Sequence, residues 1–120
     1  MEMTVGTKHE VEITVTEEVT AAKMKSGSLS VLATPYMVAL MEQAASELCD
    51  KFVPEGISTV GTALNISHLA PTCVGGKVKA VATLTAFDGE QITVTDENEN
   101  AVQLRLADLA YVKLYVEIDF

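Results

Sequence analysis

The sequence predicts an α+β fold in which one curved antiparallel β-sheet wraps around a single long helix. One stretch, residues 36–52, contains no glycine or proline and is nearly apolar over three turns, which is typical of a buried helix. The other patterned stretches alternate apolar and polar residues, as half-buried strands do. A helix with so little polar surface must be covered, and the alternating stretches predict the sheet that covers it.

Length and composition fit one domain over residues 1–120. Of the 120 residues, 48% are hydrophobic, whereas two domains would each be too small to bury a good core. Acidic residues outnumber basic ones 17 to 8, for a net charge of -9, and a nucleic-acid-binding protein would need a surplus of Lys and Arg. No apolar stretch reaches the roughly 20 residues that span a membrane. We therefore expect neither a nucleic-acid nor a membrane partner.

The first strand is predicted around Val11, Ile13 and Val15, which alternate with Glu and Thr. Residues 16–30 are polar and end in a Ser-Gly-Ser stretch, so we expect a loop there. This loop is either an ordinary surface connection or a lid over a site.

The long helix has clear start and stop signals. Thr34 is predicted to cap it, and Pro35 fits the first helical position, where its missing N–H costs nothing. Strong helix formers, mainly Met, Ala, Leu and Glu, continue as far as Phe52. Residues 53–56, which read Val-Pro-Glu-Gly, end the helix.

Four antiparallel strands are predicted after the helix, joined by short connections. Apolar residues alternate within residues 58–69, 78–86, 91–95 and 102–120, and the last strand is expected to bend or bulge at Asp108. The connections are marked by Gly75-Gly76, Asp88-Gly89 and the polar residues 96–100. Such a sheet leaves an edge strand exposed, so we expect a homodimer that pairs edge to edge, with a dimer of dimers as a further option.

Three residues break the pattern around them. Glu42 lies among apolar helix residues, where a buried carboxylate must be paired; the alternative is a helix rotated so that Glu42 reaches solvent. His68 shares the apolar parity of its strand and is either a satisfied core residue or a catalytic group. Thr34 lies at the positive end of the helix dipole, which would stabilise a thioester oxygen or a developing oxyanion.

Helix geometry limits any joint role of Thr34 and Glu42. Eight residues of helix separate them by about 12 Å along the axis. A shared role would therefore need a distorted first turn, a substrate between them or a partner subunit.

Cys49 and Cys73 have neither metal-ligand spacing nor the pattern of a disulfide framework. We therefore expect no bound metal and a reducing, cytoplasmic setting. Cys49 is expected to pack in the core. Cys73 follows His68 by five residues and remains an alternative candidate for a catalytic nucleophile.

Two stretches resemble hotdog-fold thioesterases. They are residues 33–42, which read ATPYMVALME, and residues 60–72, which read VGTALNISHLAPT. The chain is most similar to the group that includes fluoroacetyl-CoA thioesterase, with the same order of elements over residues 5 to about 95.

This resemblance implies a hotdog fold and an acyl-CoA thioesterase. It implies catalytic roles for Thr34, Glu42 and His68. It also implies that Gly75 or Gly76 borders the acyl pocket. A compact pocket for a short acyl chain is predicted from small residues on the inner face, namely Gly61, Ala63, Ala80 and Ala82. No cofactor is expected, because CoA enters as part of the substrate.

The thioesterase hypothesis gives each catalytic residue a task. Glu42 is a general base or the nucleophile, His68 orients the carboxylate or protonates the thiolate, and Thr34 with helix N–H groups holds the carbonyl. Many relatives carry a G-x-G-T-H-E-R run in the last strand, whereas residues 102–106 read VQLRL here. This departure supports the alternative of an acyl-CoA-binding or sensing dimer without turnover. A dehydratase, which the same fold also hosts, has no motif in this sequence.

Because the net charge is -9, the phosphates of CoA need local positive charge. Lys77 and Lys79 are the candidates for substrate binding, together with Arg105 and Lys113 on the last strand. The alternative is that the two lysines belong to an ordinary solvated strand face.

Overall fold

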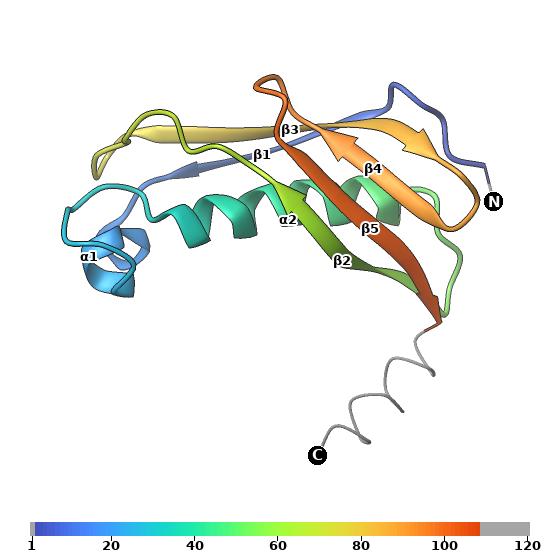
Figure 1. Cartoon of the computed structure of the whole chain (residues 1–120), viewed down its shortest axis with the longest axis horizontal. Helices are drawn as coiled ribbons and strands as arrows, with labels where there is room; N and C mark the ends of the chain where they lie inside the picture. The colour runs from blue at the N-terminus through green and yellow to red at the C-terminus, as the bar shows by residue number, and fades with distance from the viewer. Residues whose placement is uncertain (1, 109–120) are drawn as a thin grey trace, which may run out of the picture.

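A computed structural model describes residues 2–108, and within this range the chain forms the predicted sheet around a helix (Figure 1). Its elements in chain order are β1 (Lys8–Thr14), the short 3₁₀ helix η1 (Glu17–Val19), α1 (Ala21–Met24), α2 (Thr34–Asp50), β2 (Ile57–Asn65), β3 (Lys77–Phe87), β4 (Gln91–Thr95) and β5 (Ala101–Asp108). The strands form one antiparallel sheet in the order β1-β3-β4-β5-β2. Figure 1 shows this sheet curled over α2, with α1 near the start of that helix.

The core lies between α2 and the inner face of the sheet, as predicted. Apolar residues recur every three or four positions along α2, so one side of the helix is continuously apolar. The buried helix residues are Leu40, Met41, Ala44, Ala45, Leu48 and Cys49. The buried sheet residues are Ala80, Ala82, Leu84, Ile92, Val94, Val102 and Leu104. No helix within residues 2–108 is both long and apolar enough to cross a membrane.

The prediction of a plain loop over residues 16–30 is wrong in its first half, which contains η1 and α1. Thr20 organises this part of the chain and is only 1% exposed. Its hydroxyl donates to the Glu17 carbonyl at 2.8 Å and accepts from the Lys23 N–H at 3.3 Å. A four-residue helix fixed by a local cap is too short to produce a helical hydrophobic period, which is why the sequence pattern does not reveal it.

Both predicted hairpin turns are confirmed. The β3–β4 turn is closed by the Asp88 carboxylate, which accepts from the N–H groups of Glu90 and Gln91 at 3.0 and 2.7 Å. The β4–β5 turn spans residues 96–100. The bend or bulge expected at Asp108 stays a prediction, because β5 and the described residues both end at Asp108. The strand expected beyond it, including Lys113, lies outside the described residues.

β2 differs from its prediction. Val60 and Leu64 were expected on a buried face, but they are 40% and 44% exposed. The reason is that β2 is an edge strand that pairs with β5 alone, and a register shift between Gly61 and Ala63 interrupts this pairing. The strand also ends at Asn65, so His68 lies beyond it rather than on its apolar face.

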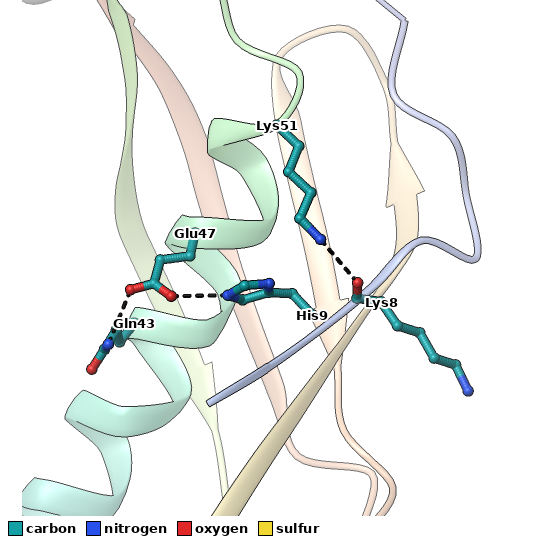
Figure 2. Close-up of polar contacts among 5 residues, drawn as sticks. All are labelled: Lys8, His9, Gln43, Glu47 and Lys51. Carbon is teal, nitrogen blue, oxygen red and sulfur yellow. Dashed lines mark hydrogen bonds and ion pairs between the residues drawn. The ribbon is translucent and has the colours of Figure 1, made fainter. Parts of the chain in front are cut away.

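Polar side chains tie α2 to the opposite edge strand, β1 (Figure 2). The Glu47 carboxylate meets His9 Nε2 at 2.8 Å and accepts from Gln43 Nε2 at 3.0 Å. One turn further, Lys51 Nζ donates to the Lys8 carbonyl at 3.2 Å. The hydrogen bond from His9, followed by that from Gln43, holds the pKa of the Glu47 carboxyl below its ordinary value of 4.5.

This lowered pKa predicts a pH-dependent contribution of Glu47 to stability. The folded protein holds the Glu47 proton less tightly than the unfolded chain, so the stabilisation is complete above pH 4.5 and disappears as the pH falls through the folded pKa. We expect the melting temperature of the wild type to exceed that of Glu47→Gln at neutral pH, and the difference to vanish in acid. Thermal denaturation followed by circular dichroism measures it. A difference that stays constant into strong acid would contradict this assignment.

Candidate active site

Two of the three predicted catalytic residues meet. Thr34 Oγ1 lies 2.7 Å from His68 Nδ1, although the two residues are 34 positions apart in the sequence. Thr34 is the first residue of α2, and His68 lies in the irregular segment after β2. When Nδ1 is unprotonated the Thr34 hydroxyl donates to it, which leaves Nε2 to carry the imidazole proton.

Thr34 does not have the capping role predicted for it. The N-cap is Ala33, which has no side-chain acceptor, so Thr34 and Pro35 occupy the first two helical positions. The N–H groups of Tyr36 and Met37 are already bonded to the Ala33 carbonyl. Within residues 2–108 no backbone acceptor bonds the Thr34 N–H. The helix start therefore offers the Thr34 N–H at this point, beside the Thr34 hydroxyl that is bonded to His68.

His68 separates two hollows in the surface. A cavity of about 220 Å³ has an apolar wall that includes Met37, Met41 and Ala80, and a polar wall formed by the turn at residues 96–100. A second cavity of about 240 Å³ lies on the α1 side and is lined by Thr34 and His68 together. His68 thus lines both cavities, whereas Thr34 lines only the second.

Glu42 lies apart from this pair. It is half-buried on α2, and its Oε2 lies against Gly61, so close that a Cβ at that position would be 2.8 Å away. The missing side chain of Gly61 therefore makes room for the carboxylate. Within residues 2–108 Glu42 lines neither of the cavities that include His68. This separation agrees with the helix geometry, which kept Thr34 and Glu42 about 12 Å apart.

Gly75 and Gly76 form a tight turn. Gly75 has φ +91°, and a Cβ on Gly76 would lie 2.6 Å from Cγ2 of Thr72. Both glycines exchange backbone hydrogen bonds with Val15 at 2.8 Å. Neither lines the two cavities that include His68. The backbone conformation and close packing of this turn therefore explain why glycine occupies both positions, without any contact to substrate.

The candidate cations differ in their surroundings. Lys77 and Lys79 are exposed on β3, and Lys79 Nζ lies 3.7 Å from a Glu10 carboxylate oxygen. Lys79 also lines the 220 Å³ cavity beside His68. Arg105 is paired with Glu90 on the outer face of the sheet, so its charge is already compensated.

The two cysteines are free and differ in environment, as predicted. Cys49 is buried in the core, and burial raises the pKa of its thiol to about 11, which makes it a poor nucleophile. Cys73 is exposed in the loop after His68.

The sequence pattern missed the polar wall of the cavity. Asp96, Asn98 and Asn100 line it together with His68, whereas their spacing indicated only a turn. Three Asn or Asp residues within five positions were the available signal, but such clusters are typical of ordinary turns.

Solved structures identify the fold. A Thermus thermophilus protein of the thioesterase superfamily is similar with a TM-score of 0.84 and 24% identity, over 98% of this chain and 94% of that one. A hot-dog-like protein from Thermanaerovibrio acidaminovorans is similar with a TM-score of 0.81 and 21% identity, over 97% and 92% of the two chains. No curated protein matches the sequence significantly. The fold is the predicted hotdog fold of thioesterases.

The sequence profile assigns the chain to a family. A point mutant of the fluoroacetyl-CoA-specific thioesterase FlK is similar with a TM-score of 0.87 and 22% identity, over 100% of this chain and 99% of that one. The sequence profile of the fluoroacetyl-CoA-specific thioesterase (FlK) family matches residues 15–104, and the chain belongs to this family. It is accordingly a thioester hydrolase of the acyl-CoA class.

Proposed function

We propose that the site at Thr34 and His68 hydrolyses a short-chain acyl-CoA to the free carboxylate and CoA. The observation that carries this proposal is the 2.7 Å hydrogen bond between Thr34 Oγ1 and His68 Nδ1 beside a cavity of about 220 Å³ with an apolar wall. A cavity of this size accommodates a short acyl group better than a long one. Among the structural relatives, FlK is specific for fluoroacetyl-CoA, and one of its mutants binds acetyl-CoA.

The reaction adds water to the thioester carbonyl carbon and breaks the C–S bond. In the protonated state of His68, Nδ1–H donates to Thr34 Oγ1, so the Thr34 hydroxyl keeps its own proton for the carbonyl oxygen. That hydroxyl, together with the Thr34 N–H, which no backbone acceptor bonds within residues 2–108, would stabilise the negative charge that develops on the carbonyl oxygen. Nε2–H of the same imidazolium would deliver a proton to the departing sulfur, which leaves a neutral imidazole bonded to Thr34 through Nδ1–H. Glu42 would take the proton from water, or attack the carbonyl itself as the nucleophile.

The position of Glu42 supports a homodimer. Glu42 contacts the Gly61 region of β2, an edge strand whose apolar residues Val60 and Leu64 are exposed. A second copy paired along this edge would cover them. It would also offer a route by which Glu42 of the partner subunit reaches the Thr34–His68 pair, since one regular helix keeps the two groups apart.

An acyl-CoA-binding or sensing dimer is the second candidate. The observation that favours it is the pairing of Arg105 with Glu90 in the strand where relatives carry the His-Glu-Arg run. Titration calorimetry separates the two candidates. A sensor binds acyl-CoA and leaves it intact, whereas a hydrolase releases thiol continuously and gives heat of reaction beyond saturation.

A double-mutant cycle tests the proposed pair. Thr34→Val removes the hydroxyl and keeps the shape of the side chain, and His68→Ala removes the imidazole. Because the two groups act through one hydrogen bond, the double variant is expected to be about as slow as the slower single variant. Rates of CoA release under saturating substrate measure this. If the rate reduction in the double variant equals the product of the two single reductions, Thr34 and His68 act independently, contrary to the proposal.

Lys77 and Lys79 are proposed to hold the CoA phosphates, with the pantetheine arm directed toward His68. Lys79 supports this because it lines the cavity that includes His68. Reversing both charges, Lys77→Glu with Lys79→Glu, is expected to raise KM for acyl-CoA and leave kcat nearly unchanged. The increase should shrink in high salt, because salt screens exposed charges.

A matched control reverses the same charge elsewhere. Lys8→Glu with Lys51→Glu changes the net charge equally at the β1 edge, so its KM should stay near that of the wild type. Equal KM values for the two double variants at low salt would place the phosphate site elsewhere.

Gly75 and Gly76 are proposed to act in substrate binding only by setting the turn that precedes Lys77.

The free thiols of Cys49 and Cys73 favour a reducing, cytoplasmic setting for this activity.

A further inference from the structure

The turn between β4 and β5 holds the backbone next to His68. Asn100 is only 6% exposed, and its Oδ1 accepts a hydrogen bond from the Ser67 N–H at 2.7 Å. Residues 67–70 belong to no helix or strand. Within the described part of the chain, the bond to Asn100 is the one hydrogen bond made by a backbone group of these four residues. The segment that carries the imidazole is thus anchored at a single backbone point.

Asp96 fixes the orientation of the Asn100 amide. One Asp96 carboxylate oxygen accepts from Asn100 Nδ2 at 2.8 Å. The other accepts from the backbone N–H groups of Asn98 and Asn100 at 2.8 and 2.9 Å. An ionised carboxylate only accepts hydrogen bonds, so the amide nitrogen must face Asp96 and the amide oxygen must face Ser67. A buried polar network in which each of these groups has a partner is rigid.

The same turn and His68 line one cavity, about 220 Å³ in volume. The imidazole therefore has two supports: the Thr34 hydroxyl on Nδ1 and the Asn100 anchor on the preceding peptide. Losing the second support would let the backbone at His68 shift while the rest of the fold is unchanged. A misplacement of about 1 Å in a catalytic group can cost about 10²-fold in rate.

We propose that Asn100 is a positioning residue for His68 and that Asp96 sets its working orientation. The inference rests on the hydrolytic role proposed for His68. Asn100→Ala is expected to lower kcat by about 10- to 10²-fold, with a smaller change in KM, because the reacting group moves while the CoA contacts remain.

An exchange of the two side chains tests the network directly. In Asp96→Asn two amide groups compete for the place between residues 96 and 100, and in Asn100→Asp two carboxylates face each other. In the double variant the amide at position 96 donates to the carboxylate at position 100, whose other oxygen still accepts from the Ser67 N–H. Both single variants should lose kcat and the double variant should regain most of it, although Asn and Asp have nearly the same side-chain volume in all three variants.

Asp88→Asn is the matched control. Asp88 closes the turn at the other end of β4 by the same kind of carboxylate hydrogen bonds, and it does not line the cavity that includes His68. The Asp88→Asn substitution should change kcat little. A drop in kcat as large as that of Asp96→Asn would show that loosening any hairpin turn has this effect, and the proposal would be wrong.

A second readout does not depend on turnover. Long-range ¹H–¹⁵N correlation spectra report the two ring nitrogens of each histidine, and His9, bonded to Glu47, serves as internal reference. The Nδ1 signal of His68 should shift in both single variants and return in the double variant, while the His9 signals stay in place. Unchanged His68 signals in folded single variants, or no recovery in the double variant, would overturn the inference.

The two readouts separate this inference from the proposed function. If the wild type hydrolyses no acyl-CoA, the proposed function fails, and the histidine signals still decide whether Asn100 positions His68. If the wild type is active and the single variants keep its kcat, only the positioning role fails. Should a single variant not fold, kcat and the His68 signals of the folded double variant decide the question.

Discussion

Glu42→Gln is expected to lower kcat for a short acyl-CoA by about 10²- to 10⁴-fold, the range that general acid–base catalysis contributes. Glutamine keeps the shape of the side chain beside Gly61 but cannot accept the proton of water or attack a carbonyl. Thiol release at saturating substrate measures the effect. Glu47→Gln is the control, because it makes the same change on the same helix, at a carboxylate bonded to His9 and Gln43 instead. Equal kcat values for the two variants would remove Glu42 from the mechanism.

Mixing two inactive variants shows which subunit supplies Glu42. If Glu42 of the partner subunit serves the Thr34–His68 pair, a dimer of one Glu42→Gln chain and one His68→Ala chain contains one intact site and one doubly defective site. After random exchange of subunits, about a quarter of the wild-type activity should return. If Glu42 serves the site of its own chain, every site in the mixture lacks one group, and no activity returns.

Leu48→Ala is expected to lower the free energy of unfolding by about 2–5 kcal/mol, because it leaves a cavity in a close-packed core. Leu48 is 0% exposed and lies on the face of α2 that packs against the sheet. Urea denaturation at fixed protein concentration measures the change. Leu29→Ala removes the same atoms from a side chain that is 66% exposed, and its effect should stay within about 0.5 kcal/mol. Similar losses for both variants would mean that the α2–sheet contact is not the stabilising core.

The fold followed from the hydrophobic periods because each long element buries one face. The period of α2 and the alternation of β3 and β5 both depend on burial that the structure confirms. β2 was harder to predict, since its apolar residues Val60 and Leu64 are exposed at an edge. Alternation indicates which residues share a face, but it does not indicate whether another element of the same chain covers that face.

The site was predictable to the extent that its residues belong to a recognisable motif. Thr34 and His68 were predicted as site residues, and the structure brings them to 2.7 Å. The hydroxyl of Thr34 was predicted to cap the helix and instead bonds His68, because Ala33 takes the capping position. Asn100 could not be found this way: its function depends on a hydrogen bond to Ser67, 33 residues away, and no local pattern records such a distant pairing.

The central claim is that this protein hydrolyses acyl-CoA thioesters with His68. The most direct test is the initial rate of CoA thiol release from acetyl-CoA, propionyl-CoA and butyryl-CoA, measured for the wild type and for His68→Ala under the same conditions. We expect the wild type to exceed the spontaneous rate for at least one of these substrates, and His68→Ala to lose about 10²-fold or more of that activity. A wild-type rate no higher than that of buffer, with acyl-CoA bound and intact in calorimetry, would contradict the claim and identify the protein as a binder.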